Sequence, residues 1–482
     1  MSDIAPWSVA AMAAAMGAER TGPLPDLVTG LSIDTRTIGR GEAFFAIQGD
    51  ARDGHDFVPA ALHAGAGLAV VAREKRDTLP NDAPLLVVGD VLEAMRDLAR
   101  AARERSQAKI IAVTGSVGKT GTKEALRLAL AASGPTHASL ASYNNHWGVP
   151  LSLARLPENA RYAVFEIGMN HAGEITPLTR LVRPHVAIVT TIEPVHLEYF
   201  GTVEAIADAK AEIFLGVEPG GAAVINRDSP YYRRLADAAK AAGVERIVSF
   251  GEHEDADARL LKVALQASSS AVHARILGSE VTYKLGAPGR HVVMNSLAVL
   301  AASALVGADL AFAALALTAL EPPSGRGQRI ALALANGGEA LLIDESYNAN
   351  PASMRAALAL LGQAAVGPRG RRIAVMGDML ELGSAGADLH RSLVEPVLGA
   401  GIDLVFGAGP LMRALWDALP SERRGGYAES AAALESQVIA AIRDGDAVMV
   451  KGSLGSRMGP IVKTLARLYS RDAAATEATA RG

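Results

Sequence analysis

The sequence predicts an α/β protein of three domains, and three observations carry this prediction. Short apolar, β-branched segments alternate with helical segments along most of the chain, which is typical of parallel sheets covered by helices. The chain has 482 residues, enough for about three domains of ordinary size. Its composition breaks at Pro322-Pro323, before the glycine-rich residues 324–327. We therefore expect a small N-terminal α/β domain at 1–89, a central parallel-sheet domain at 90–321 and a C-terminal Rossmann-like domain at 322–482.

The composition excludes several classes of protein. The chain has no cysteine, which excludes disulfides, cysteine-ligated zinc and iron–sulfur clusters. The net charge of −4 gives no basic stripe for nucleic acid and no polybasic signal for a membrane surface. The alanine-rich N-terminus carries Asp3 and no positive segment, so it does not resemble a signal peptide. We expect a cytoplasmic monomer that binds no nucleic acid and is not stably inserted into a membrane.

One stretch, 297–320, is apolar enough to resemble a membrane span. It is interrupted by Gly307-Ala308-Asp309, and a charge in the middle of a spanning helix costs about 3 kcal/mol. We therefore expect two buried helices here, with Asp309 capping the second one. A charged linker helix is expected earlier, at 90–106, and the tail from about residue 471 is expected to be disordered.

The clearest motif is a strand, a glycine turn and a helix within residues 109–124. The backbone N–H groups of such a turn and the positive end of the helix bind phosphate. Lys119 is placed to reach the β- and γ-phosphates of a nucleotide, and the Thr120 hydroxyl can bind Mg²⁺. The alternative, a turn that only joins strand to helix, is disfavoured by the Gly-Lys-Thr sequence, although the general P-loop pattern has glycine where this chain has Val113. The candidate phosphate-binding residues are Gly115, Ser116, Val117, Gly118, Lys119 and Thr120.

Two further strands of the central block are followed by side chains that can bind a metal ion. The strand at 162–166 ends in Glu166, and the strand at 185–192 is followed by His196. Ligands of open α/β sheets bind outside the carboxyl ends of the strands, so both side chains can reach the phosphates. Either residue alone could be an ordinary loop residue, but their shared position beside the P-loop favours metal binding.

A lysine interrupts the apolar stripe of the helix expected at 202–216. Hydrophobic residues recur at helical spacing on both sides of position 210, which is a lysine. One interpretation is that Lys210 extends its ammonium group to solvent. The other is a partly desolvated lysine of lowered pKa that reacts with CO₂ to give a carbamate, an anion able to bind Mg²⁺.

The last block again alternates strands and helices, with strands expected at 340–343, 373–376, 404–406 and 447–450. Each strand ends in a polar or glycine-rich loop, and the first loop begins at Asp344. The block lacks a GxGxxG after its first strand, so a dinucleotide is not indicated. Two polar clusters near the N-terminus, at 32–36 and 49–57, are equally consistent with binding and with tight turns. Asn295, at an expected helix start, can read a base edge or cap the helix.

These motifs resemble the Mur ligases of peptidoglycan synthesis. The resemblance is carried by TGSVGKT at 114–120, FEIGMNHAGEI at 165–175, HLEYFG at 196–201 and AKAEIF at 209–214. Four more stretches, at 34–58, 144–153, 344–354 and 377–383, resemble the branch of the family that uses D-Ala-D-Ala. The DNPR tetrad of the diaminopimelate-adding branch is absent, and the resemblance covers about residues 30 to 465.

The resemblance implies an ATP-dependent ligase that adds D-Ala-D-Ala to UDP-N-acetylmuramoyl-tripeptide through an acyl phosphate. The first domain would bind the UDP-sugar, the second ATP, and the third would close over ATP and bring the dipeptide. Lys119, Glu166, His196 and Lys210 would be catalytic, and Thr120, Glu166, His196 and a carbamylated Lys210 would bind Mg²⁺. Asn295 would contact adenine, Arg326 the phosphates and Asp344 the ribose. The substrate-binding residues would be Ser32, Asp34, Thr35, Arg36, Asp53, His55, Asn144, Asn145, His146, Tyr347, Asn348, Asn350, Lys451 and Ser453.

One departure and three rival functions bear on this prediction. Members of the family read Lys-Gly-Ser-Arg where this chain has Lys451-Gly-Ser-Leu-Gly-Ser-Arg457, which leaves open which residue faces the dipeptide. A GTPase would carry an N/T-K-x-D guanine reader, and none is found. A folylpolyglutamate-type ligase would lack the N-terminal clusters, whereas a non-enzymatic nucleotide-binding scaffold is not excluded by motifs. The third residue of the substrate peptide, diaminopimelate or lysine, is also left open.

Overall fold

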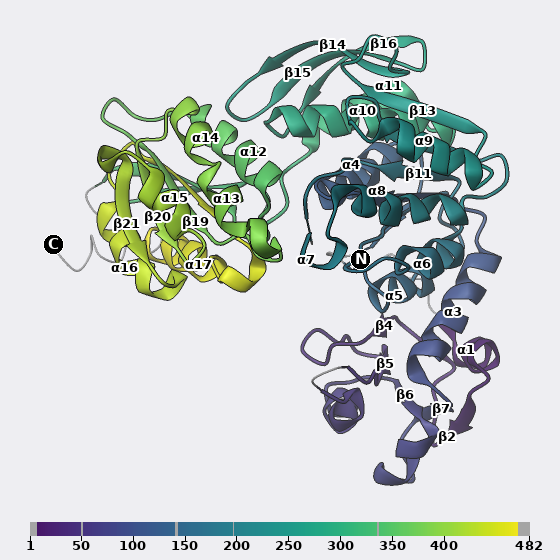
Figure 1. The fold of residues 1–482 in the computed structure, drawn as a ribbon. Helices are drawn as coiled ribbons and strands as arrows, with labels where there is room; N and C mark the ends of the chain where they lie inside the picture. Colours follow the sequence, from purple (N-terminus) through teal and green to yellow (C-terminus); the bar gives the residue numbers. More distant parts are fainter. Residues whose placement is uncertain (1–6, 50–51, 140–142, 196, 335–336, 471–482) are drawn as a thin grey trace.

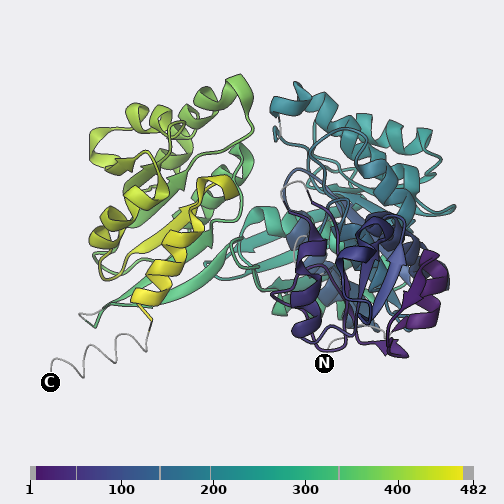
Figure 2. The same ribbon diagram turned by 90° about the horizontal axis from the view of Figure 1, so that it is seen from below.

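A computed structural model describes residues 7–49, 52–139, 143–195, 197–334 and 337–470, and three large sheets form the centres of its domains (Figure 1). The expected disordered tail lies outside these residues. The C-terminal domain lies beside the central domain, and the N-terminal domain packs on a different side of the central domain (Figure 2). The expected α/β class is confirmed.

The N-terminal domain is built on five strands in the order β2-β7-β6-β5-β4, parallel except for β2. Strand β2 lies at one edge of this sheet. A separate antiparallel pair, β1 with β3, lies beside this sheet. The elements are β1 (Trp7–Ser8), α1 (Val9–Met16), β2 (Glu19–Thr21), β3 (Leu27–Val28), β4 (Leu31–Ser32), β5 (Ala43–Phe45), α2 (Val58–His63), β6 (Leu68–Ala72) and β7 (Leu85–Val88).

The central sheet has nine strands in the order β16-β15-β14-β13-β12-β11-β8-β10-β9. It is parallel from β9 to β14, whereas β14, β15 and β16 form antiparallel hairpins. Its strands are β8 (Lys109–Thr114), β9 (Thr136–Ala138), β10 (Tyr162–Glu166), β11 (Val186–Val189), β12 (Ala222–Asn226), β13 (Arg246–Gly251), β14 (Ala258–Leu265), β15 (Ser270–Ile276) and β16 (Ser279–Leu285).

Helices cover both faces of this sheet because its strands are apolar on both sides. Ile110 and Ala112 of β8 pack into one core with α3, α5, α6, α8 and α9, while Ile111 and Val113 pack into another with α4, α10 and α11. The helices are α3 (Val91–Arg105), α4 (Lys119–Ala131), α5 (Gly148–Ala154), α6 (Ile175–Val182), α7 (Leu197–Phe200), α8 (Val203–Ala211), α9 (Tyr232–Ala241), α10 (Arg290–Leu305) and α11 (Leu310–Ala316).

The C-terminal sheet has six strands in the order β17-β18-β22-β19-β20-β21, and only the edge strand β17 runs antiparallel. Its strands are β17 (Gln328–Ala333), β18 (Glu339–Glu345), β19 (Arg372–Gly377), β20 (Leu404–Ala408), β21 (Arg424–Ala428) and β22 (Ala447–Lys451). Its helices are α12 (Pro351–Gly362), α13 (Gly386–Arg391), α14 (Val394–Gly399), α15 (Arg413–Ala418), α16 (Ala431–Ala441) and α17 (Gly459–Leu468).

Several expectations need correction. The hairpins β14–β16 and the strands β17 and β21 were not expected from the sequence. The helix expected at 202–216 ends at Ala211 and continues as a 3₁₀ segment. Asn295 lies in the second turn of α10 and not at its start, so it does not cap this helix.

Two other expectations are confirmed. The stretch 297–320 forms parts of α10 and α11, and Asp309 caps α11 by accepting hydrogen bonds from Ala311 N and Phe312 N. Among the residues that the structure describes, no helix is long and apolar enough to cross a bilayer.

Candidate active site

The turn between β8 and α4 is a tight cradle that requires glycine at two positions. Gly115 has φ +148° and Gly118 has φ +87°. A Cβ atom at Gly115 would lie 1.9 Å from Thr190 Oγ1, and one at Gly118 would lie 2.5 Å from Asn295 Nδ2. The Thr190 hydroxyl also donates to Val117 O at 2.6 Å. Neighbouring side chains therefore hold the turn in place, and its two glycines allow that close approach.

A buried carboxylate lies beside this turn. Glu166 ends β10, which pairs with β8 so that Glu166 is in register with Val113. Its side chain accepts hydrogen bonds from Thr120 Oγ1 at 2.9 Å and from Asn144 Nδ2 at 2.7 Å. Glu166 is only 1% exposed. The structure thus brings together three predicted site residues from a helix, a strand and a loop.

Two lysines lie near the same point, Lys119 half-buried and Lys210 fully buried. Lys119 Nζ donates to Gly115 O at 2.7 Å, and burial lowers the pKa of Lys119. Lys210 is 2% exposed and has no hydrogen-bond or ion-pair partner in the part of the chain that the structure describes. Burial, reinforced by the charge of Lys119, holds the pKa of Lys210 well below its usual range. The interpretation in which Lys210 extends into solvent is therefore wrong.

The oxygen donors at this point suit a hard divalent cation. Within the described residues no three His, Cys, Asp or Glu side chains are grouped so that they could hold a metal ion, and His196 lies outside those residues. Mg²⁺ binds few carboxylates and keeps waters and substrate phosphates as its other ligands. The Thr120 hydroxyl and the Glu166 carboxylate, hydrogen-bonded to each other beside a phosphate cradle, fit that requirement.

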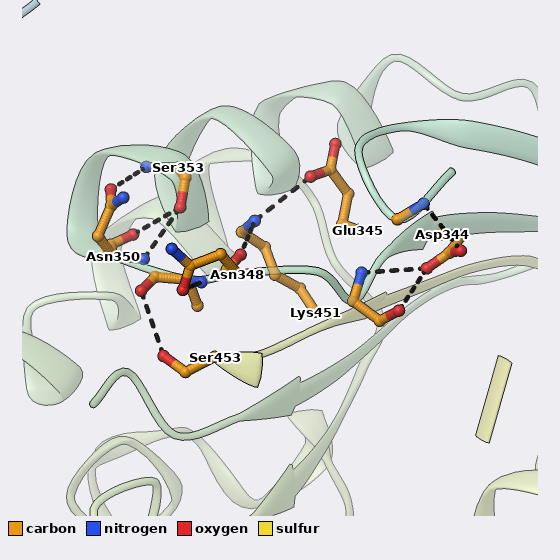
Figure 3. A network of polar contacts seen from close by, with 10 residues as sticks. Asp344, Glu345, Asn348, Asn350, Ser353, Lys451 and Ser453 are labelled. Carbon is orange, nitrogen blue, oxygen red and sulfur yellow. Dashed lines mark hydrogen bonds and ion pairs between the residues drawn. The ribbon is translucent and has the colours of Figure 1, made fainter. Parts of the chain in front are cut away.

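The C-terminal domain contributes a second set of side chains from the ends of β18 and β22 (Figure 3). Glu345 and Lys451 are in register on these parallel strands, and Lys451 Nζ lies 3.3 Å from Glu345 Oε2. Lys451 also donates to Asn348 O at 3.0 Å. Burial lowers the pKa of Lys451, although Glu345 acts in the opposite direction.

The loop after β18 is fixed mainly by its own hydrogen bonds. Asn350 caps α12 by accepting from Ser353 N, and Ser353 Oγ accepts from Asn350 N (Figure 3). Ser453 Oγ donates to Ala349 O and accepts from Leu380 N. Pro351 is the first residue of α12. These predicted substrate residues therefore shape the loop, and their role towards a substrate stays a prediction.

Side chains from both sets line one cleft of about 1550 Å³ between the central and C-terminal domains, whereas Lys210 lies behind its lining. In the cleft, the guanidinium of Arg326 lies over the Tyr347 ring, 4.2 Å from its centroid. The predicted site residues that line the cleft are Ser116, Val117, Gly118, Lys119, Thr120, Asn144, Asn145, His146, Glu166, Asn295, Arg326, Tyr347, Asn348, Asn350, Lys451 and Ser453.

Asp344 lies elsewhere. Its carboxylate accepts from Gly325 N and from the backbone N and hydroxyl of Ser346, and it lines a separate cavity of about 550 Å³. Arg457 lines that cavity too and not the large cleft. Successive residues of a strand point to opposite faces, so Glu345 faces the cleft and Asp344 does not.

The N-terminal clusters also lie outside the cleft lining. Asp34 pairs with Arg36 at 2.6 Å, and the hydrogen bond from Arg36 lowers the pKa of Asp34. Ser32 Oγ accepts from Asp34 N at 3.2 Å, and Thr35 lies in the turn between them and Arg36. This cluster is next to the central domain, because Arg155 Nε donates to Leu31 O.

Asp53 and His55 are engaged with each other. His55 Nε2 accepts from Ala72 N, so Nδ1 carries the proton and donates to Asp53 Oδ1 at 2.6 Å. Lys75 pairs with the second oxygen of Asp53 at 2.9 Å. Burial raises the pKa of Asp53, but hydrogen bonds from His55 and Lys75 outweigh it and lower the pKa well below its usual range. These contacts fix the conformation of the turn that contains Asp53 and His55, and their part in substrate binding stays a prediction.

Sequence reasoning missed several residues of the cleft, among them Glu193, His291, Glu345 and Arg355. No local pattern marks Glu345, because its partner Lys451 lies on β22, far away in the sequence. His291 lies one helical turn before Asn295 on the same helix, so the prediction that Asn295 faces the cleft could have been extended to His291. No local pattern marks Glu193 or Arg355.

The chain matches known families along most of its length. Residues 27–103 match the family described as Mur ligase family, catalytic domain; residues 113–303 match the Mur ligase middle domain; and residues 325–454 match the Mur ligase, glutamate ligase domain.

Individual proteins are similar over nearly the whole chain. The UDP-N-acetylmuramoyl-tripeptide–D-alanyl-D-alanine ligase of Rickettsia prowazekii is 32% identical over 432 residues, covering 90% of this chain and 94% of that protein. The ligase of the same name from Escherichia coli is 34% identical, with 90% and 93% covered. A crystal structure of MurF from Acinetobacter baumannii superposes with a TM-score of 0.83 at 29% identity, covering 96% of this chain and 99% of that one. The fold, the P-loop cleft and these similarities together show that the chain belongs to the Mur ligase family.

Proposed function

We propose that this chain joins D-Ala-D-Ala to UDP-N-acetylmuramoyl-tripeptide at the expense of ATP, as the names of its relatives indicate for those proteins. The observation that carries the proposal is the Thr120–Glu166 contact in a cleft lined by two domains. It places a phosphate cradle and a metal-binding carboxylate opposite the loops of a second α/β domain. An amide ligase needs this arrangement because nucleotide, acid and amine must meet in one enclosed space.

Amide formation in water is unfavourable, so the peptide carboxylate would first be phosphorylated by ATP and the dipeptide amine would then displace phosphate. Lys119 and the backbone N–H groups of residues 115–118 would hold the phosphates, and Arg326 would add positive charge from the opposite domain. Bound Mg²⁺ would neutralise charge on the phosphoryl oxygens. Thr120, Glu166, His196 and a modified Lys210 would hold this ion, and closing of the cleft would exclude the water that hydrolyses an acyl phosphate.

Lys210 would act as a carbamate. A buried amine of lowered pKa is neutral in a larger fraction of molecules than an ordinary lysine, and a neutral amine adds to CO₂ to form a carbamate with release of a proton. The absence of a partner for Lys210 in the described chain leaves its nitrogen available for this reaction. Isotopically labelled bicarbonate should give a carbamate NMR signal that is lost in Lys210→Ala, and a short carboxylic acid should partly restore activity to that variant.

The first test is phosphate release from ATP with UDP-N-acetylmuramoyl-tripeptide, in the presence and absence of D-Ala-D-Ala. We expect release to require both substrates and to yield the pentapeptide product, and Lys119→Met should abolish it. Release with another muramoyl peptide and a single amino acid would keep the family and overturn the substrate. Release with a folate and glutamate would favour the folylpolyglutamate alternative. We also keep the expectations of a monomer and of a cytoplasmic location, which sedimentation and cell fractionation would check.

A further inference from the structure

Two side chains of opposite charge line the cleft from different domains. Glu193 follows β11 in the central domain, and Arg355 lies on α12 in the C-terminal domain. Neither side chain makes a hydrogen bond or an ion pair with any other residue in the described parts of the chain. The carboxylate of Glu193 and the guanidinium of Arg355 are therefore available to each other across the cleft.

Glu193 is attached to the P-loop through its backbone. Its N–H donates to Ser116 Oγ at 3.0 Å, and the same hydroxyl donates back to Glu193 O at 3.0 Å. Ser116 N in turn donates to Thr191 O at 2.9 Å. Burial raises the pKa of the half-buried Glu193 carboxyl, and the charge of Arg355 acts against this shift. A force on the Glu193 side chain would thus be transmitted to the phosphate-binding turn.

Arg355 is attached in a similar way to the loop after β18. It lies in the second turn of α12, whose first turn is fixed by the Asn350–Ser353 capping box. The other cationic side chains of this domain that line the cleft are engaged, since Arg326 lies over Tyr347 and Lys451 pairs with Glu345. Arg355 is exposed and makes no such contact with the residues that the structure describes. Its guanidinium is therefore free to bind a carboxylate with two parallel hydrogen bonds.

We propose that Glu193 and Arg355 form an ion pair when the C-terminal domain closes over the cleft, and that the pair aligns the loops of the two sheets for phosphoryl transfer. This inference rests on the proposed ligase function, in which the cleft must close around ATP. Neither residue needs to touch the reacting atoms, so both are positioning residues. A pair formed in a closing cleft is screened less by salt than an exposed one, which favours its formation at that moment.

A double-mutant cycle tests the pair. We expect Glu193→Gln and Arg355→Gln each to lower kcat/KM for ATP about tenfold, a loss of about 1.4 kcal/mol. The double variant should be no worse than either single one, because the second change removes nothing further. Arg369→Gln, which alters an exposed arginine of the same domain outside the cleft lining, is the matched control and should retain full activity. Losses that add up in the double variant would overturn the proposal.

Closure itself supplies a second measurement, independent of the dipeptide. Small-angle X-ray scattering with a non-hydrolysable ATP analogue and Mg²⁺ should show a smaller radius of gyration for the natural chain and a smaller decrease for Arg355→Gln. Equal compaction of both proteins would refute the ion pair. This comparison does not need Glu193→Gln, so it tests the proposal even if that variant fails to fold. If the natural chain closes through the pair but does not ligate D-Ala-D-Ala, the ion pair stands and the proposed function fails.

Discussion

Lys451 is the buried charge whose removal should destabilise the C-terminal domain measurably. Its side chain is 2% exposed, and it contacts Glu345 at 3.3 Å and Asn348 O at 3.0 Å. Lys451→Met keeps an unbranched side chain that is one atom shorter, and it removes both contacts. A hydrogen bond to a charged group contributes about 1.5–3 kcal/mol.

Two facts reduce the expected cost of this change. The contact with Glu345 is long, and burial already lowers the pKa of Lys451, so its charged form carries a desolvation cost that the substitution removes. We therefore expect a net loss of about 2 kcal/mol. For a domain of this size, such a loss lowers Tm by about 4–8 °C.

Unfolding of this domain can be followed by fluorescence. The chain has three tryptophans, and Trp416 is the one within residues 322–482, so a chain with Trp7→Phe and Trp147→Phe reports this domain. Lys463→Met, at an exposed lysine of α17, is the matched control and should change stability by less than about 0.5 kcal/mol. If Lys451→Met is no more harmful than this control, or if its cost and that of Glu345→Gln simply add, the reasoning fails.

Three further predictions follow from buried groups. Lys210→Met should abolish ligation yet stabilise the central domain by about 1–3 kcal/mol, because the lysine buries an amine without a hydrogen bond in the described chain; a lower Tm in calorimetry would contradict this. Burial, aided by Lys109, lowers the pKa of His185 to about 4, below its unfolded value, so its stabilisation is complete above pH about 6.5 and is lost as the pH falls towards 4. Allowing for partial exposure, urea titrations should show about 1–2 kcal/mol of this loss, and His185→Asn, which can still accept from Ile110 N, should not show it. Glu166→Gln should lower turnover about 10²-fold and raise the Mg²⁺ concentration required, and an unchanged Mg²⁺ dependence would exclude Glu166 as a ligand.

The apolar strands of both parallel sheets could be predicted, whereas the hairpins β14–β16 could not. A strand covered by helices on both faces is a continuous apolar run, as Ile110–Val113 is. Strand β14 instead begins with an alternation in which Ala258 and Leu260 are buried and Arg259 is only half-buried. Because one face of β14 is solvated, its sequence lacks the continuous apolar run that identified the other strands. Its polar residues then resemble those of a loop.

The lysine at position 210 could be predicted, but the face on which Asp344 lies could not. A charge within an apolar helical stripe can be seen in one segment of sequence, and the structure places Lys210 in the buried stripe. The direction of Asp344 depends on the register of β18 against β22, which pairs residues more than a hundred positions apart. Neither Asp344 nor Glu345 carries a local signal of which face it occupies. The hydrogen bonds of Asp53 and His55 could not be predicted for the same reason. Their partners, Ala72 and Lys75, come from β6 and the segment after it.

The architecture explains why positions far from the reacting groups should matter to this reaction. The central domain lines the cleft with residues at the carboxyl ends of β8, β10, β11 and β12. The C-terminal domain lines it with residues at the carboxyl ends of β18, β19 and β22. Carboxyl ends of two separate parallel sheets thus face each other across a gap. Neither sheet alone brings Lys119 and Glu166 together with Arg326 and Lys451, so the reactive geometry exists only at one relative position of the two domains. A misplacement of about 1 Å can cost about 10²-fold in rate. Groups such as Glu193 and Arg355, which touch only the cleft and the loops behind it, are therefore where we expect substitutions to change kcat while each domain keeps its own stability.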